Sequence, residues 1–371
     1  MSFAAAPPGD GRALTDAALV GRILREYRFG PATVRRRYGS VAGPQVGYRL
    51  RRPAGGAVLV RAYRADQPLA SYLRGAGTAP VTDWLLGRAA TLDWLAARGY
   101  PAPRVVATRT GDPVGVAGPW LTWATSDIRG RALAPGGGQA GLLGSALGRL
   151  HALGPPLPGA APVPGAVPGL ASWPGLASWY PATAIPAALR RLGAVATLLP
   201  GEWRPLHEQF RRTLLAVQRA AAALPVAVVH GDPWPGNAVV TAGGRVTLIE
   251  WENGGVGLPV VDLGHCLLEC HLDPGLPGNR PGAWLIRPDP HRIAAVLDGY
   301  TRWRRLAGAE LAILPEGIRF GAAYLGAIHF EEALIDGVHG ATMDARLGLL
   351  RNRVAVSQAV ADLAARHLGG R

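Results

Sequence analysis

The chain has 371 residues, of which 49% are hydrophobic, so it can bury the core of one large or two ordinary domains. No run approaches the roughly 20 consecutive apolar residues that a membrane-spanning helix needs, which argues against a membrane protein. The net charge is +14, but the 39 basic residues are all Arg, are scattered and accompany no recognised nucleic-acid motif, so we do not expect a nucleic-acid partner.

The first third of the sequence predicts a small sheet with helices around it. Helical apolar spacing covers residues 13–28, and a second helix is predicted over residues 83–98. Strands are predicted at 38–41, 45–51, 57–63, 104–108 and 119–125. The first residues, MSFAAAPPGDGRALTD, lack the charged and long apolar regions of a signal peptide, so a cytoplasmic location is expected.

The rest of the sequence is mostly helical in pattern. A helix is predicted over residues 141–153, and a Pro- and Gly-rich segment that contains GLASW twice follows at 154–186. This segment is either a low-complexity insertion or a substrate-side loop that offers three aromatic rings for stacking, those of Trp173, Trp179 and Tyr180. From residue 187 onward we expect helices, apart from residues 228–255.

The two cysteines of the chain, Cys266 and Cys270, are four residues apart on a predicted helix, with His265 and His271 beside them. Their spacing fits no usual zinc pattern, and no second cysteine pair is present. We therefore interpret both as buried, reduced thiols, which agrees with a cytoplasmic location.

Residues 228–255, VVHGDPWPGNAVVTAGGRVTLIEWENGG, place several polar side chains between apolar strands. If the Gly-Gly pair at 243–244 forms a two-residue turn, the register of the hairpin puts Asn237 opposite Glu250. Asp232 lies in the loop that enters the same end. Oxygen ligands of this kind suit Mg²⁺, and an acid beside the metal can accept the proton of a hydroxyl nucleophile. The alternative is a hairpin whose polar ends face water.

HGDPWPGN followed by LIEWENGGVGLPVVDLG resembles the catalytic segment of the aminoglycoside phosphotransferase and choline kinase-like family. The four-residue gap before the Asn and the later Asp-Leu both match the pattern of this family. The resemblance implies an α+β, protein-kinase-like fold with two lobes. The N-terminal lobe, residues 1–124, is expected to be a small antiparallel sheet, and the C-terminal lobe, residues 125–371, to be larger and mostly helical.

The resemblance also implies roles for residues of the C-terminal lobe. Asp232 corresponds to the catalytic base, and Asn237 to a metal ligand. Glu250 stands where the family usually has a metal-binding Asp, so it keeps the charge but is one methylene longer. His230 is expected to brace the loop, and Asp262 to anchor it from the following helix.

In the N-terminal lobe, the resemblance implies a site for ATP with Mg²⁺. Such kinases use a Lys on the third strand and a Glu on the next helix. Here Arg61 occupies the Lys position and Arg88 falls near the Glu position, so Asp83 or Asp93 supplies the acid only if the register differs. The backbone expected to hydrogen-bond adenine is that of Thr122, Trp123 and Ala124.

The acceptor side of the sequence is poor in acidic residues. No Asp or Glu occurs between Asp127 and Glu202, and the acids left to line the acceptor site are Glu269, Asp273, Glu331, Glu332 and Asp336. Aminoglycosides carry several positive charges and should need a more acidic pocket. We therefore expect a neutral, sugar-like acceptor or an amino alcohol.

Two functional hypotheses from different classes remain. The first is an ATP-dependent kinase that moves the γ-phosphate of ATP to a hydroxyl of a small molecule, which the intact HGD and Asn favour. The second is a catalytically weak or inactive kinase-like binding module, which Arg61, Arg88 and Glu250 favour. We favour the first because Asp232 is present, and we expect neither a nucleic-acid nor a membrane partner.

Overall fold

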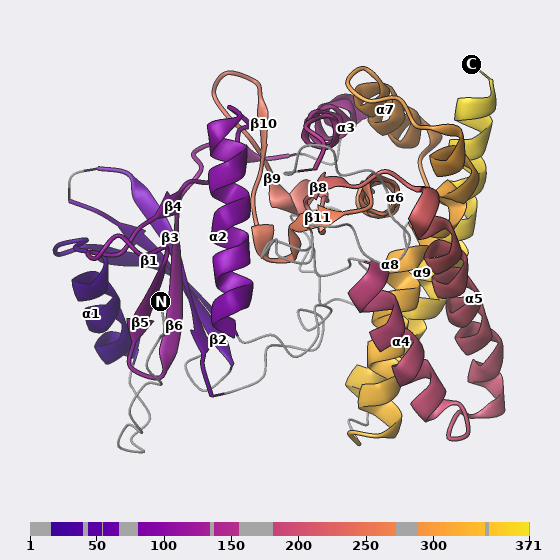
Figure 1. The fold of residues 1–371 in the computed structure, drawn as a ribbon, viewed down its shortest axis with the longest axis horizontal. Coiled ribbons are helices and arrows are strands. Elements are labelled where there is room, and N and C mark those ends of the chain that lie inside the picture. Colours follow the sequence, from indigo (N-terminus) through magenta and orange to yellow (C-terminus); the bar gives the residue numbers. More distant parts are fainter. Residues whose placement is uncertain are drawn as a thin grey trace. The chain divides into compact units, whose positions relative to one another are not determined.

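The structure is a computed structural model that describes residues 16–39, 44–53, 55–66, 81–133, 137–155, 181–271, 288–337 and 341–370. These residues form two compact units, one that ends at Ile128 and one that begins at Arg129 (Figure 1). The predicted boundary after residue 124 falls inside a strand, because that strand continues to Ser126.

The first unit is an antiparallel sheet with the strand order β1-β2-β3-β6-β4, in which β5 also pairs with β6 (Figure 1). The strands are β1 (Thr33–Gly39), β2 (Gln45–Arg51), β3 (Ala57–Arg64), β4 (Val105–Val106), β5 (Val114–Ala117) and β6 (Trp120–Ser126). The helices are α1 (Asp16–Glu26) and α2 (Val81–Ala97). The strand predicted at 38–41 is the end of the longer β1, and β5 has no counterpart among the predicted strands.

The alternation of apolar and polar residues does not identify β1, because β1 is an edge strand. Residues 33–38 are all exposed, so its sequence, TVRRRYG, carries no alternation of buried and exposed positions. The short β5 lies between two turns, where four residues give too little pattern to identify a strand.

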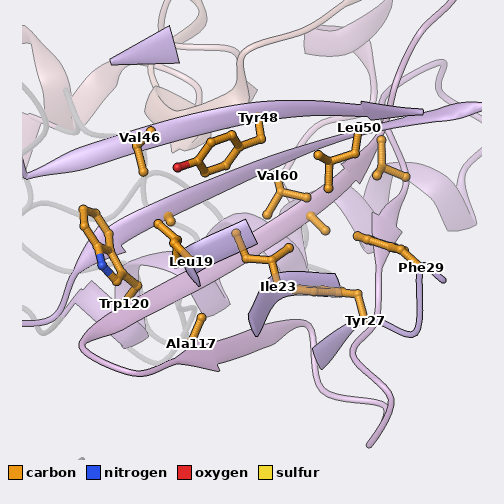
Figure 2. Packing of buried hydrophobic residues seen from close by; sticks show 13 residues of the cluster. Leu19, Ile23, Tyr27, Phe29, Val46, Tyr48, Leu50, Val60, Ala117 and Trp120 are labelled. Atoms are coloured by element: carbon orange, nitrogen blue, oxygen red, sulfur yellow. The ribbon is translucent and has the colours of Figure 1, made fainter. Parts of the chain in front are cut away.

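Helix α1 covers one face of the sheet with its apolar side. Leu19 and Ile23 of α1 are fully buried among side chains of β2 and β3, including Tyr48 and Val60 (Figure 2). Burial of two such aliphatic side chains contributes about 1.5–3 kcal/mol each to stability. This face of the sheet is therefore the core of the first unit.

Helix α2 packs on the opposite face. Side chains two positions apart on a strand share a face, so Arg61 and Tyr63 of β3 point away from α1. The ring of Tyr63 meets that of Trp84 in α2 edge to face, with centroids 5.2 Å apart. Arg88, one turn further along α2, is buried, and its guanidinium carbon lies 5.4 Å from the centre of the Trp84 ring. Arg61 and α2 therefore share one side of the sheet.

The second unit is mainly helical (Figure 1). Its helices are α3 (Gly137–Ala152), α4 (Pro181–Val195), α5 (Arg204–Ala220), α6 (Pro259–Glu269), α7 (Pro290–Thr301), α8 (Gly308–Leu334) and α9 (Ala341–Gly369). Its strands are β7 (Arg131–Ala132), β8 (Ala227–Val229), β9 (Ala238–Val240), β10 (Val246–Leu248) and β11 (Gly255–Gly257). They form two small sheets, β10-β9-β7 and β11-β8. A sheet unit followed by a helical unit confirms the predicted α+β class.

Helix α8 is the centre of the second unit, where it contacts α4, α5, α6 and α9. A Cβ atom at Gly264 of α6 would lie 2.4 Å from the backbone of Gly317 in α8, so these helices approach closely only because a glycine stands there. Within the described residues, α8 is also the one helix long and apolar enough to cross a membrane, but 61% of its apolar window is buried inside this unit. We interpret α8 as a core helix.

Candidate active site

The hairpin of β9 and β10 carries the predicted site. Val240 pairs with Val246 and Ala238 with Leu248, which leaves Ile249 opposite Asn237. The predicted pairing of Asn237 with Glu250 is therefore wrong by one residue. The loop has three residues rather than two and ends in Gly244, whose φ of 73° is left-handed. A three-residue loop that ends in a left-handed glycine is a common alternative to the two-residue turn.

Ile249 joins the hairpin to the preceding loop through its backbone. Its N–H donates to the carbonyl oxygen of Asn237 at 2.9 Å, and its carbonyl oxygen accepts a bond from Nε2 of His230 at 2.7 Å. Since Glu250 is the next residue, this junction places its backbone beside the loop that contains Asp232. The contact between the hairpin and the loop therefore runs through Ile249, the neighbour of Glu250, and not through a direct pair of Asn237 with Glu250.

Glu250 has a left-handed backbone, with φ 65° and ψ 59°. This conformation is uncommon for residues other than Gly, Asn and Asp, and holding a residue in it costs of order 1–3 kcal/mol. Strain of this kind gathers at functional sites, where the surrounding structure holds it in place. Glu250 is half-buried, two residues after the end of β10.

Two side chains hold the carboxylate of Asp232, one on each oxygen. Nε2 of His265 donates to Oδ1 at 3.0 Å, and Nδ2 of Asn237 donates to Oδ2 at 2.7 Å. Burial alone would raise the pKa of Asp232, but its interactions with His265, His230 and Asn237 together hold the pKa below its usual value. The Asp232 side chain is still 34% exposed, so an ionised carboxylate remains accessible to a ligand.

The donor set at this site suits a hard cation. Both bonds of the Asn237 side chain use Nδ2, so its Oδ1 is the atom that can ligate a metal, and Glu250 supplies carboxylate oxygens. In the part of the chain that the structure describes, no group of three or more His, Cys, Asp or Glu side chains could hold a metal ion. A cation here would draw on the oxygens of Asn237 and Glu250 and complete its shell with water and phosphate oxygens, as Mg²⁺ often does.

Asp262, in the first turn of α6, holds the backbone of the loop. Its two carboxylate oxygens accept the N–H groups of His230 and Gly231, each at 2.8 Å. Gly231 has a φ of 81°, and a Cβ atom there would lie 2.3 Å from the carbonyl oxygen of Asn253, so the loop requires glycine at this position. The expected anchoring contact of Asp262 is present in the structure.

A chain of buried polar groups continues from Asp262 into the helices. Nε2 of His151 donates to Asp262 at 3.0 Å, and Nδ1 of His151 lies 2.9 Å from the hydroxyl of Tyr300. Arg304 donates to that hydroxyl at 3.0 Å and pairs with Glu310 at 2.8 Å. Burial lowers the pKa of His151, so this ring is neutral and can donate at one nitrogen and accept at the other.

His230 is also buried and neutral. Because a carbonyl oxygen only accepts, Nε2 of His230 carries the proton that it donates to Ile249, and Nδ1 accepts the N–H of Asp232 at 3.3 Å. Burial lowers the pKa of His230, which agrees with this tautomer. The ring therefore links the loop to the hairpin, which is the bracing contact expected of it.

The cysteines are buried free thiols, as predicted. Burial raises the pKa of Cys270 to about 12, and that of Cys266 is raised well above its ordinary value for the same reason. Neither sulfur ionises near neutral pH, so neither is suited to bind a metal or act as a nucleophile.

The residues predicted to bind nucleotide lie in the first unit. Arg61 is half-buried on β3, between Gly47 of β2 and Trp123 of β6 in the register of the sheet. Thr122, Trp123 and Ala124 are buried in the middle of β6 and pair with β3 on one side and with β4 or β5 on the other. Their peptide groups face other strands, which does not agree with the expectation that they bind adenine.

Three of the four described acids that were expected on the acceptor side lie against basic side chains, and the fourth, Asp336, is exposed just after α8. Glu269 is buried in an ion pair with Arg353 of α9, and Glu331 pairs with Arg191 at 2.7 Å. Glu332 lies 3.2 Å from His329. The remaining candidates on this side, Trp173, Trp179, Tyr180 and Asp273, lie outside the described residues.

His265 and Arg353 are the site residues that sequence reasoning missed. His265 stands out in the sequence only by its place beside Cys266, and Arg353 lies in a helix of ordinary composition, 121 residues after Asp232. The charge of Arg353 nevertheless acts on Asp232, and burial lowers the pKa of Arg353 to about 10. No local pattern marks either residue, because each contact joins segments that are distant in sequence.

Comparison with known proteins extends these observations. The sequence matches the model of the phosphotransferase enzyme family over residues 48–309, well over half of the chain. No curated protein matches the sequence.

Several solved structures share the fold. A complex of amicoumacin kinase with AMP-PNP and Ca²⁺ is 14% identical, with a TM-score of 0.61 and 94% of each chain covered. The microcompartment-associated aminopropanol kinase is 17% identical, with a TM-score of 0.55 over 96% of this chain and 98% of the other. An aminoglycoside phosphotransferase from Alicyclobacillus acidocaldarius is 16% identical, with a TM-score of 0.54 over 97% and 98%.

At these identities the structural likeness shows the fold alone, and it confirms the predicted kinase-like architecture. The sequence match is the finding that goes further, because it covers both the strand with Arg61 and the loop with Asp232. The chain belongs to the phosphotransferase enzyme family.

Proposed function

We propose that this protein is an ATP-dependent phosphotransferase that moves the γ-phosphate of ATP to a hydroxyl group of a small molecule. The observation that carries the proposal is the state of Asp232. Its carboxylate is held on both oxygens, has a lowered pKa and is still 34% exposed. A fixed, ionised and accessible carboxylate is suited to orient a hydroxyl and accept its proton.

In the proposed phosphoryl transfer, Asp232 would act as the base. As the hydroxyl loses its proton to Asp232, its oxygen forms a bond to the γ-phosphorus of ATP, and the bond from this phosphorus to the β–γ bridging oxygen breaks. ADP leaves with the electron pair of that bond. Asn237 and Glu250 would hold Mg²⁺, which neutralises charge on the phosphate oxygens when bound, and Arg61 would contribute a further positive charge.

The charge of the acids expected around the acceptor site limits which acceptor could bind. Ion pairs with Arg353 and Arg191 offset the charges of Glu269 and Glu331, which reduces the negative charge that the described acids of this side offer to a polycation. The names of the similar structures include kinases of amicoumacin and aminopropanol. We propose a neutral or singly charged hydroxyl compound, sugar-like or an amino alcohol, rather than an aminoglycoside, and a cytoplasmic location.

A kinase-like module with little or no catalysis is the second candidate. Glu250 in place of the shorter Asp and the buried Arg88 favour it, because both depart from the family pattern at positions expected to handle the metal and the phosphates. This candidate predicts ligand binding without Mg²⁺-dependent turnover.

Calorimetric titration with ATP, with and without Mg²⁺, separates the two candidates. We expect Mg²⁺-dependent binding that weakens about tenfold or more in Glu250→Ala, because a metal ligand is lost. The matched control is Glu208→Ala, which removes an exposed acid of α5 and should change nothing. Asp232→Asn should bind MgATP but form ADP about 10²- to 10⁴-fold more slowly. Absence of binding at millimolar MgATP would contradict the phosphotransferase and favour the binding module.

A further inference from the structure

His265 is the buried side chain that touches the candidate base from outside the catalytic loop. It lies on α6, 33 residues after Asp232, and its Nε2 donates to Oδ1 of Asp232 at 3.0 Å. The His265 side chain is 4% exposed, so its surroundings restrict the ring to this position. Neither the family pattern quoted above nor the predicted sites assign a role to it.

Helix α6 holds the catalytic loop through two of its side chains, one that binds the backbone of the loop and one that binds Asp232. Asp262 binds the backbone N–H groups of His230 and Gly231, and His265, almost one turn later, binds the side chain of Asp232. Residues three apart lie on the same face of a helix, so one face of α6 sets both the place of the loop and the direction of the carboxylate.

The two bonds on Asp232 restrict its carboxylate together. Asn237 binds Oδ2 from within the loop, and His265 binds Oδ1 from α6. With only the Asn237 bond, the carboxylate can rotate about its terminal torsion, which is broad in aspartate. A bond on each oxygen stops this rotation and leaves the exposed edge of the carboxylate in a fixed direction.

We propose that His265 is a positioning residue for phosphoryl transfer, which holds the carboxylate of Asp232 in the orientation that accepts the proton of the acceptor hydroxyl. The proposal rests on the proposed function of the same site. It predicts a selective effect: loss of the His265 bond lowers kcat, because misplacement of a catalytic group by about 1 Å can cost about 100-fold. The KM for MgATP changes little, because His265 touches the base and not the expected nucleotide ligands.

The test compares Gln and Asn at position 265, two polar side chains that differ in length by one methylene. The terminal amide nitrogen of Gln can occupy the place of Nε2, whereas that of Asn is one methylene too short. We expect His265→Gln to keep kcat within about threefold of the wild-type value, and His265→Asn and His265→Ala to lose about 10- to 100-fold, with the KM for MgATP unchanged in all three. Cys266→Ala, on the same helix but away from Asp232, serves as the control with unchanged kcat.

The assay measures ADP release from MgATP with water, and then with glycerol, 1-amino-2-propanol and ethanolamine as probe hydroxyl acceptors. Thermal melting of each variant shows whether it is folded. The comparison of Gln with Asn keeps the test decisive even if His265→Ala does not fold, because both replacements are polar and smaller than the ring.

Three results would overturn the proposal. Equal kcat values for His265→Gln and His265→Asn, whether high or low, would show that the bond to Asp232 has no positioning role while the phosphotransferase stands. A change confined to the KM for MgATP would assign His265 to nucleotide binding instead. Failure of the wild-type protein to bind MgATP or to release ADP with any probe would overturn the proposed function itself, and the positioning role with it.

Discussion

At the scale of single residues, Glu250 and Asp232 differ in how the fold holds them. Asp232 receives two hydrogen bonds that lower its pKa, whereas Glu250 is held in a left-handed backbone that ordinary side chains avoid. The first residue shows stabilisation of a charge, and the second shows strain at the position where the family usually has a shorter acid.

The strain at Glu250 predicts an unusual order of stability among its variants. Glu250→Gly should have a free energy of unfolding about 1 kcal/mol higher than Glu250→Ala, because glycine adopts a φ of 65° without a Cβ clash. Urea denaturation of the two variants measures the difference. Both variants should bind MgATP more weakly than the wild-type protein, since both lack the carboxylate. Equal stability of the two would show that the surroundings relieve the strain.

At the scale of helices and strands, the buried chain from Asp262 to Glu310 ties α3, α6, α7 and α8 to the catalytic loop. Each member donates or accepts in a direction set by its neighbour, so the chain tolerates few substitutions. The hydroxyl of Tyr300 is its central link, because it meets both His151 and Arg304.

Tyr300→Phe is therefore expected to lower the free energy of unfolding by about 1–3 kcal/mol, because it leaves a buried nitrogen of His151 without its partner. Tyr38→Phe is the matched control: this ring is 42% exposed on β1, and its loss of a hydroxyl should change stability by less than about 0.5 kcal/mol. Chemical denaturation of both variants at pH 7.5 gives the comparison, and equal effects would contradict the role of Tyr300.

The same elements predict how stability depends on pH. Burial lowers the pKa of His151 and of His230, so below about pH 6.5 the unfolded chain binds protons that the folded chain does not. The stabilisation is complete above this pH and decreases as pH falls. Urea denaturation at pH 7.5 and pH 5 should show a lower free energy of unfolding at pH 5, and a His151→Gln variant should show a smaller decrease. A free energy of unfolding that is the same at both pH values would mean that these rings are protonated in the folded protein.

At the scale of the whole molecule, the sequence contains no Lys, so Arg is the only strongly basic side chain that could bind the phosphates of a nucleotide. The proposed phosphate recognition at Arg61 would therefore depend on guanidinium groups. An arginine-directed reagent such as phenylglyoxal should abolish MgATP binding, and bound MgATP should protect against it. Acylation of amines, which reaches only the N-terminus, should leave binding intact. Loss of binding on amine acylation would contradict this expectation, and calorimetry measures both results.

The kinase-like class was predicted from the resemblance of the catalytic segment, and local patterns agreed with the small sheet that this class implies. The alternating residues of β2 and β3 and the apolar spacing of α1 and α2 are short-range patterns, and HGDPWPGN encodes a loop with its glycine and acid at set positions. The edge strand β1 and the short β5 were not predictable in full, because neither has buried and exposed residues in a readable alternation.

The catalytic segment of the sequence was enough to predict the fold class, through its resemblance to a known family, and to propose Asp232, Asn237 and Glu250 as the chemical groups of the site. How these groups are held depends on contacts that form only in the folded chain. The tertiary structure moved the hairpin register by one residue through a left-handed Gly244, and it brought His265 to Asp232. It also paired Glu269 with Arg353. The last two contacts join segments 33 and 84 residues apart, and the packing of helices sets such contacts, not the pattern of neighbouring residues.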